Sequence, residues 1–177
     1  LRHALLRAKE LAMGGADLFC SPALRYFLYN DVTSSHFYTE TEESLKHYSA
    51  LDDSDIISAL KVWSECDDKV LSRLCADFIG RRLFRAEVFE GEVPEEVVAE
   101  RRRKVAEALG IRPDEARNFV EVKRVAKEMY SATTEGIRLL YPDGGVHDVA
   151  AASHIVSADT PVATDCKHYL LSLRLDE

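Results

Sequence analysis

The stretch that most constrains the fold runs from Leu51 to Phe89, because it carries the start signals of two helices. Asp53 or Ser54 can cap the first helix and Asp67 or Asp68 the second, since short polar side chains accept hydrogen bonds from the free N–H groups of a first turn. Apolar side chains then recur at helical spacing in both segments. They are Ile56, Ile57, Leu60 and Trp63 in the first, and Val70, Leu71, Leu74, Cys75 and Phe78 in the second. The stretch therefore predicts two packed amphipathic helices.

A basic turn follows the second predicted helix, where Gly80 supplies a stop signal. Three arginines surround an apolar pair there: Arg81, Arg82 and Arg85, around Leu83 and Phe84. If the chain is extended from Arg81 onward, the period of two residues places Arg81 and Arg85 on the same face. Arginines in this arrangement can bind phosphate through their planar forks. The alternative is that they form ion pairs with nearby acids such as Asp77 and Glu87.

The chain of 177 residues is long enough for one large domain or two small ones with a substantial core. Its net charge of −8 argues against general affinity for nucleic acid, so any site for a polyanion must be a local basic cluster. The four cysteines form no CxxC pair, which favours reduced thiols in a cytoplasmic protein over a zinc site. No apolar run approaches the roughly 20 residues of a membrane helix.

The N-terminal part is predicted to be helical. Leu1–Met13 reads as an amphipathic helix that begins at the first residue without a cap, as a cut within a longer helix would leave it. We therefore expect the sequence to be the C-terminal part of a larger protein. Ser21 caps a short helix ending at Tyr29, with Pro22 at its first position. A loop over 30–39 and a polar helix over 40–49 lead to the central helices.

Beyond Arg81 the pattern changes to short strands around one helix. In order, the expected elements are a strand over 83–89, a helix over 93–109, strands over 119–129 and 136–141, a turn over 142–145, a short strand or helix start over 146–153, and a strand over 167–175. This is the split βαβ order of a ferredoxin-like βαββαβ module. The predicted fold class is thus α+β, with a helical region over 1–80 continuing from a missing upstream domain and a ferredoxin-like module over 81–177.

Four segments carry a resemblance to a known family: LDDSDI (51–56), RRLFR (81–85), YPDGGVHDV (141–149) and KHYLLSLR (167–174). Together they resemble the C-terminal half of HD-superfamily nucleotide phosphohydrolases, which include bacterial proteins similar to deoxynucleoside triphosphate triphosphohydrolases. In that family, the histidines and aspartates that bind the divalent metal lie in a helical domain upstream of the first helix seen here. The resemblance implies that the intact protein hydrolyses a nucleotide phosphate bond with a metal-activated water.

For this chain, the resemblance implies an accessory role without catalysis of its own. It implies contact with the upstream HD domain, homo-oligomerisation and a possible nucleotide effector. In vertebrate relatives, the positions matching Arg81 and Arg85 contribute to effector binding at a subunit interface, which makes these two the candidate phosphate-binding residues. The alternative is a free-standing ligand-sensing or protein-interaction module that presents a sheet or a strand edge to a partner.

Other motifs favour structural roles. His147 and Asp148 follow a Gly-Gly turn and lack the converging histidines of a metal site, although His154 is near in sequence, so we expect a solvated turn histidine rather than a metal ligand. The aspartates at 52, 53 and 55 suit a capped helix start better than a cation site. The basic run Arg101–Lys104 has Glu100 and Glu107 at helical spacing, which favours a self-neutralised face over a patch for RNA or an acidic partner. Neither a phosphate-binding glycine loop nor a nucleophile arrangement is evident, so we predict no catalytic residue and no metal site here.

Overall fold

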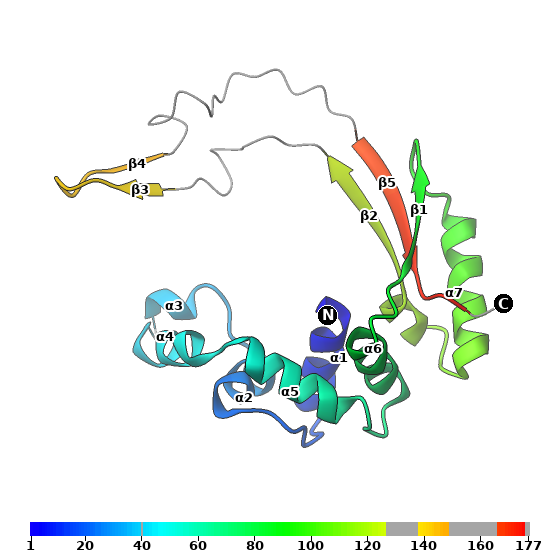
Figure 1. Ribbon diagram of the computed structural model, residues 1–177, viewed down its shortest axis with the longest axis horizontal. Helices are drawn as coiled ribbons and strands as arrows, with labels where there is room; N and C mark the ends of the chain where they lie inside the picture. Colours follow the sequence, from blue (N-terminus) through cyan, green and yellow to red (C-terminus); the bar gives the residue numbers. More distant parts are fainter. Residues whose placement is uncertain (40, 127–137, 149–165, 176–177) are drawn as a thin grey trace.

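The computed structural model describes residues 1–39, 41–126, 138–148 and 166–175 (Figure 1). Its N-terminal part is a layer of helices: α1 (Arg2–Met13), α2 (Pro22–Tyr29), α3 (His36–Thr39), α4 (Thr41–Ala50), α5 (Asp53–Trp63) and α6 (Lys69–Ile79). Its C-terminal part contains strands β1 (Arg85–Phe89), β2 (Val120–Ala126), β3 (Arg138–Leu140), β4 (Val146–Asp148) and β5 (Cys166–Ser172), with helices α7 (Glu95–Leu109) and η1 (Glu115–Asn118). The predicted α+β class is confirmed. No helix in these ranges combines the length and apolar character needed to cross a membrane.

Side-chain caps fix where several helices begin. The Ser21 hydroxyl accepts a hydrogen bond from the Leu24 N–H, and the Asp68 carboxylate accepts one from the Leu71 N–H, as predicted. Helix α5 differs, because its cap is Asp52 and not Asp53 or Ser54. Asp52 and Asp55 form a reciprocal capping box, in which each carboxylate accepts a hydrogen bond from the backbone N–H of the other. That second hydrogen bond explains why the helix starts one residue earlier than predicted.

The core lies where α1, α5 and α6 meet and continues under the sheet. Helix α1 contributes small residues, since Ala4, Ala8 and Ala12 are buried while Leu1, just before the helix, is 53% exposed. Leu60 and Trp63 of α5 are almost completely buried, and so are the predicted residues of α6 except one. The exceptions to the predicted core, Ile57 and Phe78, are each 36% exposed because they lie at the margins of their helical faces.

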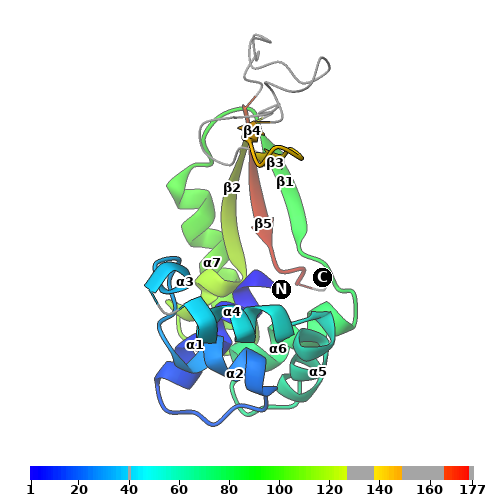
Figure 2. The same cartoon turned by 90° about the vertical axis from the view of Figure 1, so that its left-hand side faces the viewer.

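The main sheet has three antiparallel strands in the order β1-β5-β2, so the last strand in the chain lies between the other two (Figures 1 and 2). Arg85 and Val120 both pair with Ser172, which sets the register at one end. Helix α7 covers one face of this sheet (Figure 1). Arg101 of α7 donates to the Ser172 hydroxyl at 2.6 Å and to the Glu87 carboxylate at 2.7 Å, which ties the helix to β5 and β1.

The sheet differs from the four-stranded one of a ferredoxin-like module. The described part of the predicted strand 136–141 pairs only with β4, and together they form a separate two-stranded sheet. The physical reason is the intervening turn, in which Gly144 adopts a φ of 83° and donates to the Tyr141 carbonyl, so the segment folds back on itself. The ferredoxin-like detail is therefore not confirmed by the described residues. Of the short strand or helix start predicted over 146–153, residues 146–148 form β4. The rest of it lies in segment 149–165, which is outside the described residues, as is segment 127–137.

The chain is not extended from Arg81, which corrects the prediction for the basic turn. Arg81 adopts a left-handed conformation with φ of 55°, and the Arg82 N–H donates to the Asp77 carbonyl at 2.8 Å. This is the hydrogen-bond pattern of a Schellman helix end, a position usually taken by glycine. Gly80 keeps a φ of −77°, so the arginine after it makes the reversal and the strand begins only at Arg85.

Candidate functional site

Arg81 differs from Arg82 and Arg85 in its ion pairs. Its side chain is exposed, and within the described residues no carboxylate lies within ion-pair distance of it. Its left-handed backbone costs about 1–2 kcal/mol for a residue with a Cβ, a cost that glycine would avoid. An exposed arginine with a strained backbone and no acid partner among the described residues favours a role in ligand binding over a role in stabilising the fold.

Arg82 and Arg85 instead pair with the two acids named as the alternative. Arg82 donates from Nε to Asp77 at 2.6 Å, and Asp77, which is 3% exposed, is also held by Arg73 at 2.8 Å. Arg85 lies 3.5 Å from the Glu87 carboxylate in a looser contact, and its side chain is 63% exposed. Arg82 is thus fixed by a buried acid, whereas Arg85 retains freedom to move. No described contact gives Arg81 and Arg85 a common partner. Their phosphate-binding role remains a prediction.

The remaining sequence motifs have structural surroundings. The His147 ring packs edge-on against Tyr141, with 5.1 Å between ring centroids, at the base of the β3–β4 turn. Among the described residues, no group of three or more histidine, cysteine or acidic side chains is placed to hold a metal ion. Arg103 donates to both Glu100 and Glu107, and this contact lowers the pKa of Glu100, so the self-neutralised helix face is confirmed at that position. Arg101 turns inward to the sheet instead.

A buried ion-pair network around Arg7 was not predicted. Arg7 is 8% exposed and donates to Asp68 at 2.6 and 3.1 Å, to Glu115 at 2.9 Å and to Glu10 at 3.0 Å. It therefore joins α1 to the start of α6 and to η1. Burial raises the pKa of Asp68, but the hydrogen bonds and charge of Arg7 and the Leu71 N–H outweigh it and leave that pKa below its ordinary value. The sequence did contain a signal for this network, because Arg7 lies among the alanines of the inner face of α1, where a charged residue needs an acid partner.

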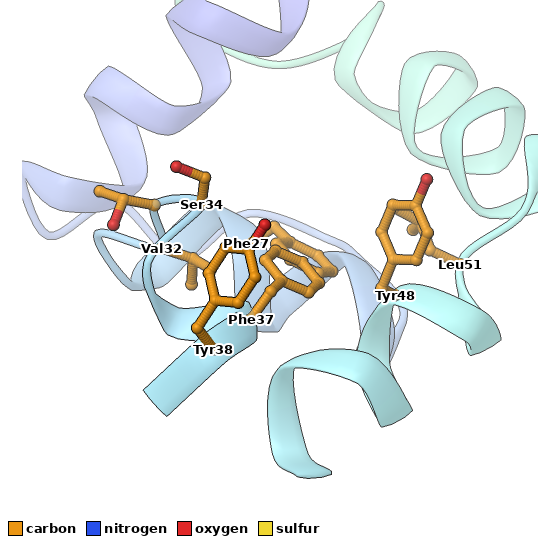
Figure 3. A pocket seen from close by; sticks show the side chains of 8 residues that line it. Phe27, Val32, Ser34, Phe37, Tyr38, Tyr48 and Leu51 are labelled. Atoms are coloured by element: carbon orange, nitrogen blue, oxygen red, sulfur yellow. The ribbon is translucent and has the colours of Figure 1, made fainter. Parts of the chain in front are cut away.

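An aromatic hollow of about 550 Å³ opens between α2, α3 and α4 (Figure 3). Its lining residues are Phe27, Val32, Thr33, Ser34, Phe37, Tyr38, Tyr48 and Leu51. Figure 3 shows the rings of Phe27, Phe37 and Tyr38 close together, and Tyr48 packs edge-on against Phe37 with 5.7 Å between ring centroids. Tyr38 is 86% exposed and Tyr48 is 61% exposed, so large apolar surface faces the solvent here. Such a surface can bind an apolar group.

Comparison with solved structures shows similarity to a phosphohydrolase. No protein-family model matches the chain, and no curated protein is significantly similar to it. A crystal structure of a phosphohydrolase from Bacteroides thetaiotaomicron superimposes with a TM-score of 0.77 at 38% sequence identity, over 97% of this chain and 42% of that chain. The chain thus spans less than half the length of that phosphohydrolase. It has a fold related to the corresponding part of a phosphohydrolase.

Proposed function

We propose that the chain is the C-terminal accessory region of a metal-dependent HD-type (deoxy)nucleoside triphosphate phosphohydrolase, where it supports oligomerisation or effector binding. The observation that carries this proposal is the match to a phosphohydrolase over 97% of this chain but only 42% of the other. A reaction with metal-activated water needs several converging ligands. In this proposal the metal centre belongs to the upstream HD domain of the intact protein, as the family resemblance implies.

Within this proposal, Arg81 and Arg85 bind the phosphates of a nucleotide effector. Arg81 supplies an exposed guanidinium with no acid partner among the described residues. Arg85 can release Glu87 at little cost, because that carboxylate keeps a closer contact of 2.7 Å with Arg101. Two guanidinium groups on one short segment suit a polyphosphate, which accepts paired hydrogen bonds from planar forks.

The test is the rise in melting temperature that a deoxynucleoside triphosphate causes in the full-length protein, compared between wild type and variants. Arg81→Gly is expected to raise the melting temperature without nucleotide, since glycine removes about 1 kcal/mol of backbone strain, and to reduce the nucleotide-induced rise. Arg85→Gln is expected to reduce the nucleotide-induced rise but to leave the melting temperature without nucleotide unchanged. Arg103→Gln, an exposed arginine on α7, is the control and should leave the rise unchanged. A full nucleotide-induced rise in the Arg81→Gly, Arg85→Gln double variant would remove both residues from this role.

The aromatic hollow supports a second candidate function, a protein-interaction module without catalysis. Tyr38 and Tyr48 expose apolar rings on the rim of the hollow, and tyrosine is enriched at protein interfaces. The partner we consider is a second copy of this chain, since a homo-oligomer is also part of the first proposal.

Replacing both tyrosines by serine is expected to shift the mass measured by sedimentation towards the smaller species at micromolar concentration. The physical reason is the loss of two exposed rings that a partner would otherwise remove from water. Leu140→Ser on β3, where the side chain is 75% exposed, is the matched control and should leave the mass as it is. An identical mass for wild type and the double tyrosine variant would exclude the hollow as the contact.

A further inference from the structure

A second hollow, separate from the basic turn, lies between α1, α7, η1 and the start of β2. Its volume is about 740 Å³, and it is lined by His3, Leu6, Glu10, Arg102, Arg117, Asn118, Val120, Glu121 and Val122. Ligand sites for small molecules commonly measure about 300–1,000 Å³. Because β5 separates β2 from β1, this hollow lies at the opposite edge of the sheet from Arg85. A ligand bound here would thus be independent of the proposed effector site.

Two arginines of the hollow, Arg102 and Arg117, are weakly paired or unpaired among the described residues. Arg102 is exposed and forms no ion pair within the described part of the chain, although its neighbours Arg101 and Arg103 are both bound to glutamates. Arg117 is 62% exposed and reaches Glu10 only at 3.5 Å. Both guanidinium groups are therefore available to a ligand. Arg102 lies on α7 and Arg117 on η1, and the fold brings both to the same hollow.

The two carboxylates of the hollow have basic partners outside it. Glu121 accepts a hydrogen bond from Lys123 at 2.9 Å, contacts His3 at 2.8 Å and lies 3.4 Å from Arg2. Glu10 accepts a hydrogen bond of 3.0 Å from the buried Arg7, a cation that it shares with Asp68 and Glu115. Both acids are thus at least partly neutralised from outside the hollow, and Arg102 keeps no ion pair among the described residues. In a chain whose net charge is −8, an anion needs locally available cations of this kind.

One side of the hollow is apolar. Leu6 is 49% exposed and Val122 is 41% exposed, and both line the hollow beside the buried Val120. A ligand that fills this space consequently needs a charged end for the arginines and an uncharged end for the apolar wall. We propose that the hollow binds a small phosphate-bearing molecule with an apolar or aromatic moiety, of the nucleotide class, with Arg102 and Arg117 as its phosphate contacts. This proposal goes beyond the effector role of the basic turn and uses none of its residues.

The experiment is calorimetric titration of the full-length protein with dATP, with pyrophosphate and with adenosine as separate probes. Arg102→Gln combined with Arg117→Gln is expected to weaken one dATP-binding event and one pyrophosphate-binding event, those of this hollow, by at least about tenfold, because each arginine contributes charge-assisted hydrogen bonds. Both residues are exposed, so the melting temperature without ligand should stay as in the wild type. The matched control is Arg103→Gln, which changes the neighbouring residue on α7 and should bind like wild type.

The variants of the basic turn separate this site from the first one. With Arg81→Gly and Arg85→Gln combined, one dATP-binding event that depends on Arg102 and Arg117 should remain. Binding of dATP to the Arg102→Gln, Arg117→Gln variant with wild-type affinity and stoichiometry would overturn the inference. So would binding of adenosine but not pyrophosphate, since the arginines would then have no part in recognition, and so would no binding of any of the three probes at millimolar concentration.

Discussion

Replacing Arg7 by methionine is expected to lower the free energy of unfolding by about 3 kcal/mol, the largest effect we predict for a charged residue. Methionine fills most of the space, but it leaves the Asp68 carboxylate, with 21% of its side chain exposed, without a cation, and Glu115, which is 14% exposed, with Arg112 alone at 3.3 Å. A partly buried acid without a partner costs more than the pair contributes when intact. Urea denaturation, followed by the fluorescence of the single tryptophan, measures the change.

Two comparisons separate the network from a general loss of charge. Arg103→Met removes an exposed arginine with two acid partners and should cost less than about 1 kcal/mol. Asp68→Asn keeps an oxygen that can cap α6, so adding it to Arg7→Met should recover part of the loss. A double variant that loses the full sum of the single effects would show that the Arg7–Asp68 contact carries no coupling.

The same network predicts a pH dependence with a definite sign. The pKa of Asp68 lies below its ordinary value of 3.8 in the folded chain, so the unfolded chain takes up that proton at a higher pH. The stabilisation is present above pH 3.8 and is lost as the pH falls through the lower folded value. In the Arg7→Met variant this part of the acid dependence should disappear, and its persistence would assign it to other carboxylates.

Trp63→Ala is expected to be the most damaging change in the core, with a loss of about 3–5 kcal/mol. Trp63 is 1% exposed, and its Nε1 donates to the Phe19 carbonyl at 2.9 Å. Alanine leaves a cavity and an unsatisfied carbonyl together. Since the fluorescent probe is lost with the tryptophan, unfolding is followed by far-ultraviolet circular dichroism.

A control for this prediction lies on the same helix. Val62 is 49% exposed, so Val62→Ala should change the free energy of unfolding by no more than about 0.5 kcal/mol. Trp63→Phe should fall between the two, because phenylalanine keeps most of the buried area and loses only the hydrogen bond. A loss below about 1 kcal/mol for Trp63→Ala would mean that α5 is not held through this side chain.

Local signals in the sequence were sufficient where neighbouring residues decide the structure. Ser21 and Asp68 cap the helices predicted for them, and Gly110 ends α7 in the left-handed conformation that its type favours. The predicted cap of α5 was wrong by one residue, because Asp55 accepts a hydrogen bond from the Asp52 N–H and so favours Asp52 over Asp53 as the cap. The short helix α3 falls in a segment predicted as a loop, since its four residues carry no periodic signal.

Contacts between distant segments could not be predicted from the sequence. Arg7 meets Asp68 and Glu115 across two elements, and Arg102 shares a hollow with Arg117 across a helix boundary. The spacing of apolar residues along the sequence does not indicate which distant residues come into contact. The conformation of Arg81 was missed for a different reason, since Gly80 beside it is the better candidate for a left-handed residue by type. The candidate phosphate-binding residues were found through family resemblance, and the structure adds the exposure and the ion pairs that distinguish them.

The middle strand of the main sheet is made of residues 166–172, whereas its neighbours are residues 85–89 and 120–126. During synthesis on the ribosome, β1 and β2 therefore have no partner strand until β5 emerges, because each pairs with β5 and they do not pair with each other. Such nonlocal pairing slows assembly and leaves strand edges open to other chains in the meantime. A nascent chain stopped before residue 166 is expected to be more prone to aggregation than one that includes β5.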